Sequence, residues 1–490
     1  MALRTAKQYI ESLRDGRVVY VQGMKVADVT THPNMKITVD HCANVFELQA
    51  DPKYRDLFTV EENGERISRY FAFPKTPVEL EKRRQMIDTH TTLGRGQLNL
   101  TKAIGSDALM AATVVAHQMK EKLGKPEYSQ RLEEYVKWVK KHDPTIVAAV
   151  TDVKGDRSKR PHEQADPDLY VHIVERRKDG VVVRGAKAHT TASPTANEII
   201  FIPTRAMTEK DAEYAVAFSI PANTKGIKLI CRPMLSSDAS KFDNPVSGHN
   251  LEGESVTVLD DVFVPNERLF MAGEWQFAGL LAHSFANFHR FTGVSYRPPL
   301  GDLLIGAAAL IAQYNGVDKA PHIRDKIIKL IQYTEMIRAC AISAAALPHT
   351  EPPGIAMPNV TYTNVGKHHF ANSFHEAVRL LQDIAGGLVI TTPIEADLLN
   401  PETGPYIRKY LAGVKGVSTE DRLRAFHFIR DLTASDFGGY ALVGTLHGEG
   451  PQAAQNIAVL SEYDIKRCVE LVKKACGIAT EAPAPVGARA

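Results

Sequence analysis

Cysteine is scarce in this sequence, and the few cysteines form no motif. The five among 490 residues are scattered, without a CxxC pair and without histidines at zinc-finger spacing. We therefore expect reduced, mostly buried thiols and no structural metal. The residues concerned are Cys42, Cys231, Cys340, Cys468 and Cys476.

The chain also lacks an excess of charge of one sign and any long apolar run. With 59 Lys and Arg against 57 Asp and Glu, the formal net charge is +2. No run of five or six like charges occurs, so there is no electrostatic footprint for nucleic acid or an anionic membrane. No apolar run approaches the roughly twenty residues of a membrane span, and the amphipathic start MALRTAKQYIESL lacks the apolar core of a signal peptide. The sequence predicts a soluble, cytoplasmic protein.

Hydrophobic periodicity divides the chain, because 490 residues are too many for one core. Residues 1–146 predict an N-terminal helical domain. In residues 147–275 the period changes to two, which predicts a small β-sandwich or barrel. Residues 276–480 predict a C-terminal bundle of long helices. The tail of residues 481–490 is expected to be disordered. The fold class is thus mainly α with a central β-domain.

Start and stop signals place helices in the first domain. Thr76-Pro77 marks one helix start. The string SDALMAATVVAHQMKEKLG predicts a helix capped by Ser106 or Asp107 and closed at Gly124, and SQRLEEYVKWVKKHD predicts a third. Between the first two lies a loop in which Arg95 has a glycine on each side. These glycines would let the backbone approach a ligand, although a solvated surface arginine is the alternative.

Two further loops are candidates for holding a polar ligand. Residues 151–157, TDVKGDR, precede the strands and could wrap a ligand with backbone donors, or could be an ordinary Asp-Gly turn. In the bundle, long helices are expected at 301–315, 322–347, 364–385, 419–436 and 453–477. They are interrupted by IAGGL at 384–388 and LHGEG at 446–450. Such breaks expose backbone N–H groups that suit a phosphate, but glycine is also the usual helix C-cap.

The stretch from His283 to Gly316 joins a polar, aromatic segment to a long apolar helix. Residues 303–311 leave no wide polar face, so this half belongs in a bundle core. The first half places His289 near Phe285, Phe288 and Phe291. A titratable imidazole among aromatic rings suits proton transfer, and a hydrogen-bonded structural histidine is the alternative.

Several strings resemble one flavoprotein family of acyl-CoA dehydrogenase-like architecture. They are DPDLYVHIVERRKDGVVVRGAKAHTTAS, LDDVFVPNERLF, FANFHR, GDLLIGAAALIAQYNG and LLQDIAGGL. This family unites 4-hydroxybutyryl-CoA dehydratase with the reduced-flavin-dependent 4-hydroxyphenylacetate 3-monooxygenase. The resemblance implies FAD between the β-domain and the bundle, and a homotetramer built as a dimer of dimers. It assigns FAD contacts to Lys154, Gly155, Asp156, Arg157, Thr190 and Thr191, and to His447, Gly448, Glu449 and Gly450, the last four across a subunit boundary.

The dehydratase resemblance is incomplete at its metal centre. That enzyme holds a [4Fe–4S] cluster with three cysteines and one histidine, and the matching positions here are Asn99, Ala103, Tyr296 and His289. Since thiolates are the normal ligands of such a cluster, we expect none in this protein. Removal of an unactivated hydroxyl would then lose its main driving force, whereas a double-bond shift needs only a base. Glu254 matches a carboxylate near the dehydratase site and is a candidate for that base or for a partner of His289.

The resemblance to the monooxygenase is also partial. Its phenol pocket uses an arginine, which Arg95 matches, and two residues whose positions fall near Asn99 and Ala148. His289, with Tyr296 beside it, would then remove the phenol proton. Our first hypothesis is the oxygenase component of a two-component monooxygenase, supplied with reduced FAD by a separate reductase and acting on a small aromatic or phenolic substrate. The alternatives are a cluster-free isomerase or dehydratase-like enzyme acting on an acyl-CoA, and a non-catalytic flavin-binding protein.

Overall fold

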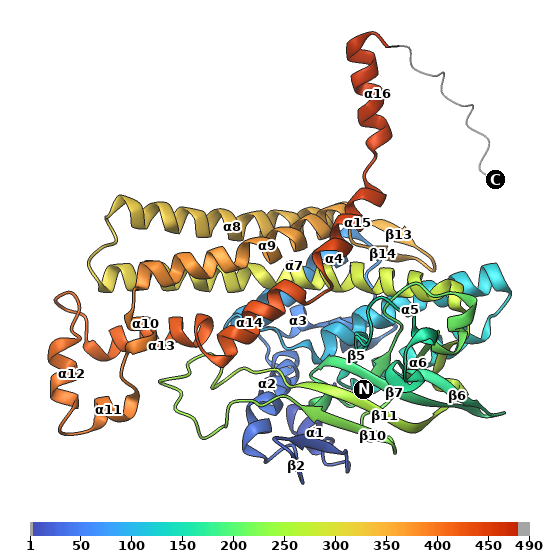
Figure 1. The fold of residues 1–490 in the computed structure, drawn as a ribbon, viewed down its shortest axis with the longest axis horizontal. Coiled ribbons are helices and arrows are strands. Elements are labelled where there is room, and N and C mark those ends of the chain that lie inside the picture. Colours follow the sequence, from blue (N-terminus) through green and yellow to red (C-terminus); the bar gives the residue numbers. More distant parts are fainter. Residues whose placement is uncertain (1–2, 479–490) are drawn as a thin grey trace.

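The computed structural model describes residues 3–478 and follows the predicted order of helices, strands and helices (Figure 1). The N-terminal part is mainly helical and also contributes four short strands. Its elements are α1 (Ala6–Glu11), β1 (Val19–Val21), β2 (Met24–Lys25), α2 (Pro33–Ala50), α3 (Arg55–Phe58), β3 (Thr59–Glu62), β4 (Glu65–Ser68), α4 (Pro77–Leu93), α5 (Leu100–Leu123) and α6 (Glu127–His142).

Two sheets make up the β-domain. One has the strand order β2-β1-β10-β11-β7-β6 and the other β12-β9-β8-β5. Strand β1 of the N-terminal part pairs in parallel with β10, so the first sheet is wider than the middle segment alone. The bounds are β5 (Ile146–Ala149), β6 (His172–Arg176), β7 (Gly180–Thr191), β8 (Glu198–Phe201), β9 (Val216–Pro221), β10 (Ile227–Cys231), β11 (Glu254–Pro265) and β12 (Leu269–Ala272).

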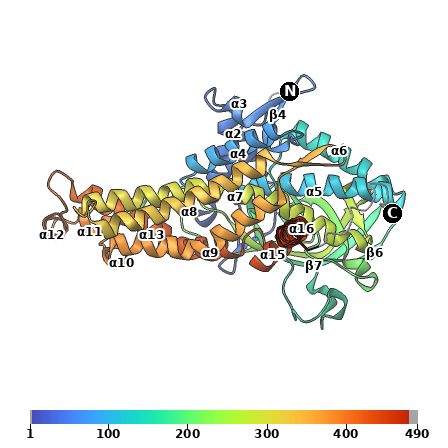
Figure 2. The same ribbon diagram turned by 90° about the horizontal axis from the view of Figure 1, so that it is seen from above.

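The C-terminal part is a helical bundle that extends away from the β-domain (Figures 1 and 2). Its three long helices, α7 (Trp275–Tyr314), α8 (Pro321–Ala346) and α9 (Val360–Ala385), lie side by side and pack on one another. The remaining elements are β13 (His349–Glu351), β14 (Ile355–Met357), α10 (Leu388–Thr391), α11 (Glu395–Leu399), α12 (Gly404–Tyr410), α13 (Thr419–Thr433), α14 (Asp436–His447), α15 (Gln452–Glu462) and α16 (Ile465–Cys476).

Helix α7 differs from the prediction because it does not begin at residue 301. It is one helix of 40 residues that continues through Pro298 and Pro299. Each proline removes a backbone donor from the helix interior, which normally favours a break or a kink. Here both prolines are buried and α7 packs against α4, α5, α8 and α9. Tertiary packing therefore keeps the helix intact, and His289 lies on the same helix as the apolar segment.

Helix α5 also begins earlier than predicted. Its N-cap is Asn99, whose side chain accepts a hydrogen bond from the Thr101 N–H, and it ends at the left-handed Gly124 as predicted. Ser106 and Asp107 are therefore not caps. They lie inside the helix with no exposed surface. A buried carboxylate in a helix interior requires partners, and those partners belong to the site described below.

The predicted helix 453–477 is divided into α15 and α16. Tyr463 is extended, and the side chain of Asp464 accepts from the Arg467 N–H to start the new helix. Helix α16 projects from the body (Figure 1) and carries no buried residue. Its Cys468 and Cys476 are partly or fully exposed, whereas the other three cysteines are buried as expected. The tail 481–490 lies outside the described residues.

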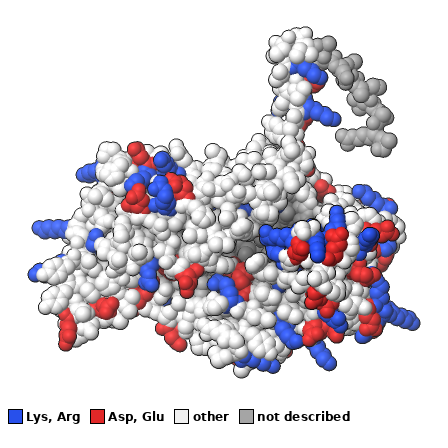
Figure 3. All heavy atoms as spheres, viewed as in Figure 1, with Lys and Arg blue, Asp and Glu red and all other residues white. Residues whose placement is uncertain are grey.

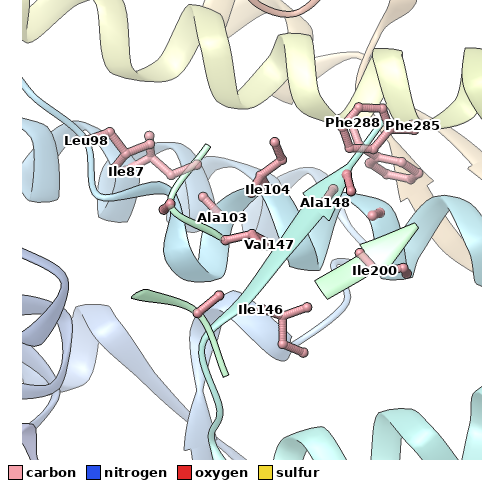
Figure 4. Close-up of a cluster of buried hydrophobic side chains, with 14 of the residues drawn as sticks. Ile87, Leu98, Ala103, Ile104, Ile146, Val147, Ala148, Ile200, Phe285 and Phe288 are labelled. Atoms are coloured by element: carbon pink, nitrogen blue, oxygen red, sulfur yellow. The ribbon is translucent and has the colours of Figure 1, made fainter. Parts of the chain in front are cut away.

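The core between α5 and the β-domain sets the position of the site. Ala103 and Ile104 of α5 share an apolar cluster with Val147 and Ala148 of β5 (Figure 4). Gly105 faces β5 so closely that an added Cβ would clash with the backbone carbonyl of Ile146. A glycine at this position therefore lets α5 approach the sheet.

We predict that Gly105→Ala lowers stability by about 1–3 kcal/mol, because the added methyl group overpacks the contact with β5. The matched control is Gly306→Ala in α7, where a Cβ would meet no atom within 4 Å. Replacing a helical glycine at that open position should stabilise by about 0.5–1 kcal/mol. Thermal unfolding of the two variants should shift in opposite directions, and equal shifts would contradict the close packing of α5 on β5.

Candidate functional site

His289 lies at the contact between α7 and α5, where it meets the buried Asp107. The distance from His289 Nδ1 to Asp107 Oδ2 is 3.0 Å. Asp107 also accepts hydrogen bonds from Arg83, at 2.7 Å, and from Thr292, at 2.9 Å. Because an arginine holds this carboxyl group as a carboxylate, the imidazole is the donor and its proton is on Nδ1. Nε2 makes no hydrogen bond within residues 3–478.

The ring of Phe285 fixes the other side of His289. The two ring centroids are 5.1 Å apart and the rings are stacked. His289 is 6% exposed, and Phe288 next to it is 1% exposed. Of the three predicted aromatic neighbours, Phe285 stacks on His289, and this contact together with Asp107 orients the imidazole. What sequence reasoning missed was Asp107, since its spacing in SDALMAAT suggested a cap.

A second polar cluster lies along the same helix. Tyr296, two turns after His289, donates a hydrogen bond to Glu449, and Lys367 Nζ is 3.4 Å from the same carboxylate. Burial would raise the pKa of Glu449, but Lys367 and Arg297 outweigh burial and the pKa is lowered. Glu449 is therefore ionised, and burial lowers the pKa of Lys367 to about 8.

Gly293 makes room for Glu449 between His289 and Tyr296. An added Cβ on Gly293 would be 3.2 Å from the Glu449 carboxyl carbon. The backbone of Glu449 has a φ of 54°, and its carbonyl accepts a hydrogen bond from Arg290. The loop between α14 and α15 thus brings the Glu449 side chain into this cluster, while His447 is exposed and Gly448 and Gly450 are partly buried.

Two buried carboxyl groups line the start of β11. Glu254 accepts hydrogen bonds from Thr191, at 2.8 Å, and from Tyr440, at 2.7 Å, while its second oxygen has no partner. Burial raises the pKa of Glu254 to about 7 and that of Glu252 to about 8. Both groups therefore hold or exchange a proton near neutral pH. Neither is hydrogen-bonded to His289 within the described residues; the partner of His289 is Asp107.

The residues expected to contact a flavin include Thr190 and Thr191, which end β7, and the loop 154–157, which follows a bridge between Asp152 and Lys187 of the same strand. The loop residues Lys154, Gly155, Asp156 and Arg157 are exposed. Thr190 is 1% exposed and its hydroxyl has no hydrogen-bond partner in the structure, whereas the Thr191 hydroxyl binds Glu254. A buried unpaired hydroxyl costs free energy unless a ligand or water satisfies it. These residues fit a flavin, with cationic side chains available to phosphate and Thr190 to a polar ring atom.

The three positions that match the cluster cysteines of the dehydratase hold other residues in this chain. Asn99 caps α5 and donates a hydrogen bond to the His41 carbonyl at 2.6 Å. Ala103 lies in the apolar cluster of Figure 4 and offers no donor atom, and Tyr296 is bound to Glu449. Residues 3–478 contain no group of three or more His, Cys, Asp and Glu side chains suited to a metal ion. This set of residues does not fit an iron–sulfur cluster.

Arg95 makes no hydrogen bond to His289 or Asp107 within the described residues. Its side chain is exposed and donates to the carbonyl of Pro245 at 2.8 Å. The adjacent Gly96 packs on α7 at Leu300 and Leu303. Leu300 is eleven residues beyond His289, which corresponds to roughly 17 Å along a helix.

Comparison with known proteins gives matches along nearly the whole chain. Family models described as the N-terminal and C-terminal parts of 4-hydroxyphenylacetate 3-hydroxylase match residues 5–271 and 278–477. The chain is 36% identical to 4-hydroxybutyryl-CoA dehydratase/vinylacetyl-CoA Δ-isomerase of Clostridium aminobutyricum, covering 97% of this chain and 100% of that protein. It is 29% identical to the 4-hydroxyphenylacetate 3-monooxygenase oxygenase component of Thermus thermophilus, covering 89% of each.

Solved structures give relatives of the same two kinds. An oxygen-tolerant archaeal 4-hydroxybutyryl-CoA dehydratase from N. maritimus superposes with a TM-score of 0.93 at 34% identity, covering 100% of this chain and 98% of that one. The oxygenase component of 4-hydroxyphenylacetate 3-monooxygenase complexed with FAD superposes with a TM-score of 0.89 at 27% identity, covering 96% and 98%. In the described part of this chain, no helix is both long enough and apolar enough to cross a membrane.

Proposed function

The chain belongs to the 4-hydroxyphenylacetate 3-hydroxylase family, and from this premise we propose that it is the oxygenase component of a two-component flavin monooxygenase. It would receive reduced FAD from a separate reductase and hydroxylate a small phenolic substrate. Relatives named as monooxygenases include the Thermus protein and a 4-nitrophenol monooxygenase oxygenase component of Rhodococcus opacus, 28% identical over 89% of this chain and 83% of that protein.

The observation that supports this proposal is the hydrogen bond between His289 and Asp107. A carboxylate that holds Nδ1–H leaves Nε2 as a base of fixed direction, and the neighbouring phenylalanine rings exclude water. A phenol is a weak nucleophile until its proton is removed, so a positioned base is what this chemistry requires from the protein.

In the proposed reaction, different residues of the chain bind the cofactor and transfer the proton. Bound reduced FAD would supply both electrons and activate dioxygen, of which one atom enters the ring and the other leaves as water. Lys154, Arg157, Thr190 and Thr191 would hold the cofactor. His289 Nε2 accepts the phenol proton. Tyr296, ordered by Glu449, presents a second polar group on the same side of α7.

The same residues support the absence of an iron–sulfur cluster. Asn99 and Ala103 provide no thiolate, and the phenol of Tyr296 is committed to Glu449. Burial raises the pKa of Tyr296 well above its usual value, which disfavours the phenolate form that a metal would need. We therefore propose that FAD is the resident cofactor, without a cluster.

A second candidate is an isomerase that moves a double bond in an acyl-CoA. The specific observation in its favour is Glu254, whose raised pKa of about 7 and free carboxyl oxygen suit the transfer of a carbon-bound proton. The 36% identity to a protein named as dehydratase and isomerase also supports the isomerase. Such a reaction needs no dioxygen, so oxygen dependence separates the two candidates.

Labelled dioxygen tests the proposed reaction directly. Protein supplied with reduced FAD and a panel of phenols, including 4-hydroxyphenylacetate and 4-nitrophenol, is expected to give a hydroxylated product containing one atom from ¹⁸O₂. Iron analysis of the same preparation should give no iron. Conversion of vinylacetyl-CoA without oxygen, together with no labelled phenol product, would replace the monooxygenase by the isomerase.

His289→Asn tests the proposed base. We expect the rate of the chemical step to fall by roughly a hundredfold or more, the usual scale for losing a general base, with folding and FAD binding nearly unchanged. The matched control is His283→Asn, because His283 is an exposed histidine of the same helix. Rate, melting temperature and flavin occupancy should be measured together. A stable variant with near-normal turnover would remove His289 from the mechanism.

We also propose a homotetramer, a dimer of dimers with FAD at a subunit interface. The support is apolar surface on the last helices, where Ile457, Leu460 and Val472 are each more than 60% exposed. On the face shown in Figure 3, charges of both signs are intermixed, and the projecting helix shows uncharged surface beside a few charged side chains. Such surface on a projecting element favours association with another copy.

Light scattering of the wild-type protein should give four subunits. Val469→Glu combined with Val472→Glu adds two charges to the exposed side of α16 and should yield a smaller assembly with weaker FAD binding. Exposed substitutions of this kind leave the subunit fold intact. A wild-type monomer that binds FAD at full affinity would contradict both the tetramer and the shared cofactor site.

A further inference from the structure

The loop of residues 151–157 is held in its shape by side chains that lie behind it. Its residues 154–157, which are expected to contact a flavin, are exposed and have no regular secondary structure. Such a loop normally samples several conformations, and ordering it when a ligand binds costs free energy. The groups that order this loop in advance therefore influence how strongly it binds a cofactor.

Gln164 holds the loop at Asp156. The side-chain oxygen of Gln164 accepts a hydrogen bond from the Asp156 N–H at 3.0 Å, and its side-chain nitrogen donates to the Asp156 carbonyl at 2.9 Å. One amide thus binds both backbone polar groups of a single residue, as a neighbouring strand does in an antiparallel sheet. Because Gln164 is only 8% exposed, it fixes the loop from the protein side and leaves the outer face open.

Gly155 makes room for this contact. Its backbone has a φ of 52°, which favours glycine, and an added Cβ would be 2.5 Å from the side-chain oxygen of Gln164. On the other side of the glycine, the hydroxyl of Tyr170 donates to the Lys154 carbonyl at 3.0 Å. Two side chains from the following segment therefore bind the backbone of the loop within three residues.

The position of Gln164 is itself fixed. It follows a short 3₁₀ turn, Pro161–Glu163, in which Nδ1 of His162 lies 2.5 Å from Oδ1 of Asp211. Asp211 has no exposed surface and also accepts a hydrogen bond from the Thr208 N–H at 2.9 Å. This contact ties the turn to the β-domain, so the Gln164 amide is in place before a ligand binds.

A buried ion pair fixes the start of the loop. Nζ of Lys187 in β7 lies 2.5 Å from Oδ1 of Asp152, and the two residues are 3% and 6% exposed. The same nitrogen donates to the carbonyls of Val150 and Ile202, each at 2.9 Å. An ammonium group has three donors, and all three are used inside the protein. Lys187 therefore acts on the loop and has no donor left for a ligand.

We propose that Gln164 and Lys187 are positioning residues for the flavin, which keep the loop 151–157 in its binding shape and act on the cofactor only through that loop. The proposal rests on FAD being the cofactor of this chain. Without either residue, the loop would have to be ordered when FAD binds, so the affinity for FAD falls while the β-domain stays folded.

Titration of the flavin-free, full-length protein with FAD measures the effect of Gln164. Gln164→Met keeps the length of the side chain and removes both hydrogen bonds, and we expect the Kd of FAD to rise about tenfold or more. The matched control is Gln382→Met, because Gln382 is a partly buried glutamine of α9 whose amide donates to the Thr433 carbonyl at 3.1 Å. The control should bind FAD as the wild type does, and the melting temperatures of the two flavin-free variants should be alike.

Lys187→Met tests the ion pair, and Lys102→Met is its match. Lys102 forms a buried pair with Asp143, also at 2.5 Å. Both variants leave a buried carboxylate without its cation and should lose stability to a similar extent. Only Lys187→Met should also weaken FAD binding, and similar FAD affinities of the two variants would contradict the role of Lys187. If Lys187→Met does not fold, Gln164→Met still tests the proposal.

Limited trypsin cleavage of the flavin-free protein gives a readout that needs no cofactor. Trypsin cuts after lysine and arginine, and the sites in and next to the loop are Lys154, Arg157 and Lys159. Gln164→Met should be cut there roughly fivefold faster than the wild type or more, because cleavage follows the population of the open loop. Gln382→Met should be cut at the wild-type rate. Cleavage of Gln164→Met at the wild-type rate would contradict the proposal.

The titration separates this proposal from that of the cofactor. Equal affinity of the wild type and Gln164→Met for FAD would overturn the positioning role and leave FAD as the cofactor. A wild-type protein that binds no FAD would overturn the cofactor and this inference together.

Discussion

The packing of α7 on α5 is the contact on which the site depends. Asp107 has no exposed surface, and three groups from two helices bind its carboxylate: Arg83 of α4, and His289 and Thr292 of α7. Removing one partner of a buried ion pair typically costs about 3–5 kcal/mol, because the remaining charge stays buried. The carboxylate therefore fixes the register of α7 against the N-terminal helices. The same register places Gly293 and Tyr296 opposite Glu449, so that one interaction orders both polar clusters.

Sequence reasoning identified what local signals determine. The order of helical, β and helical parts follows from periodicity, and the helix start at Thr76 and stop at Gly124 follow from capping chemistry, which the structure confirms. It was wrong where tertiary packing decides. A helix was expected only from residue 301, but buried contacts along α7 keep it continuous from Trp275 through Pro298 and Pro299. Asp107 is a residue type that often caps a helix, and its place in SDALMAAT suggested that role. Only the position of α7 shows that its partner is His289, 182 residues away.

The candidate site was predictable in the same uneven way. His289 among aromatic residues was visible in the sequence, because the histidine and its rings are neighbours on one helix. Arg95 was grouped with it because Arg95 matches the arginine of the monooxygenase's phenol pocket, but the distance between the two residues depends on where the Arg95 loop packs along α7. The sequence could not show whether Glu252 and Glu254 exchange protons near neutral pH. Burial raises their pKa values, and burial is known only from the structure.

His289 and the Arg95 loop meet α7 at different levels along the helix. From His289 to Leu300, which Gly96 of the Arg95 loop contacts, the backbone of α7 rises roughly 17 Å. In the proposed reaction, a phenol at His289 would find further polar contacts near Tyr296 and Glu449, where the cations Arg297 and Lys367 lie. The carboxylate of Glu449 neutralises part of the positive charge of Arg297 and Lys367. In the proposed reaction, the group of the substrate that lies farthest from its phenol would therefore be neutral or carry a single charge.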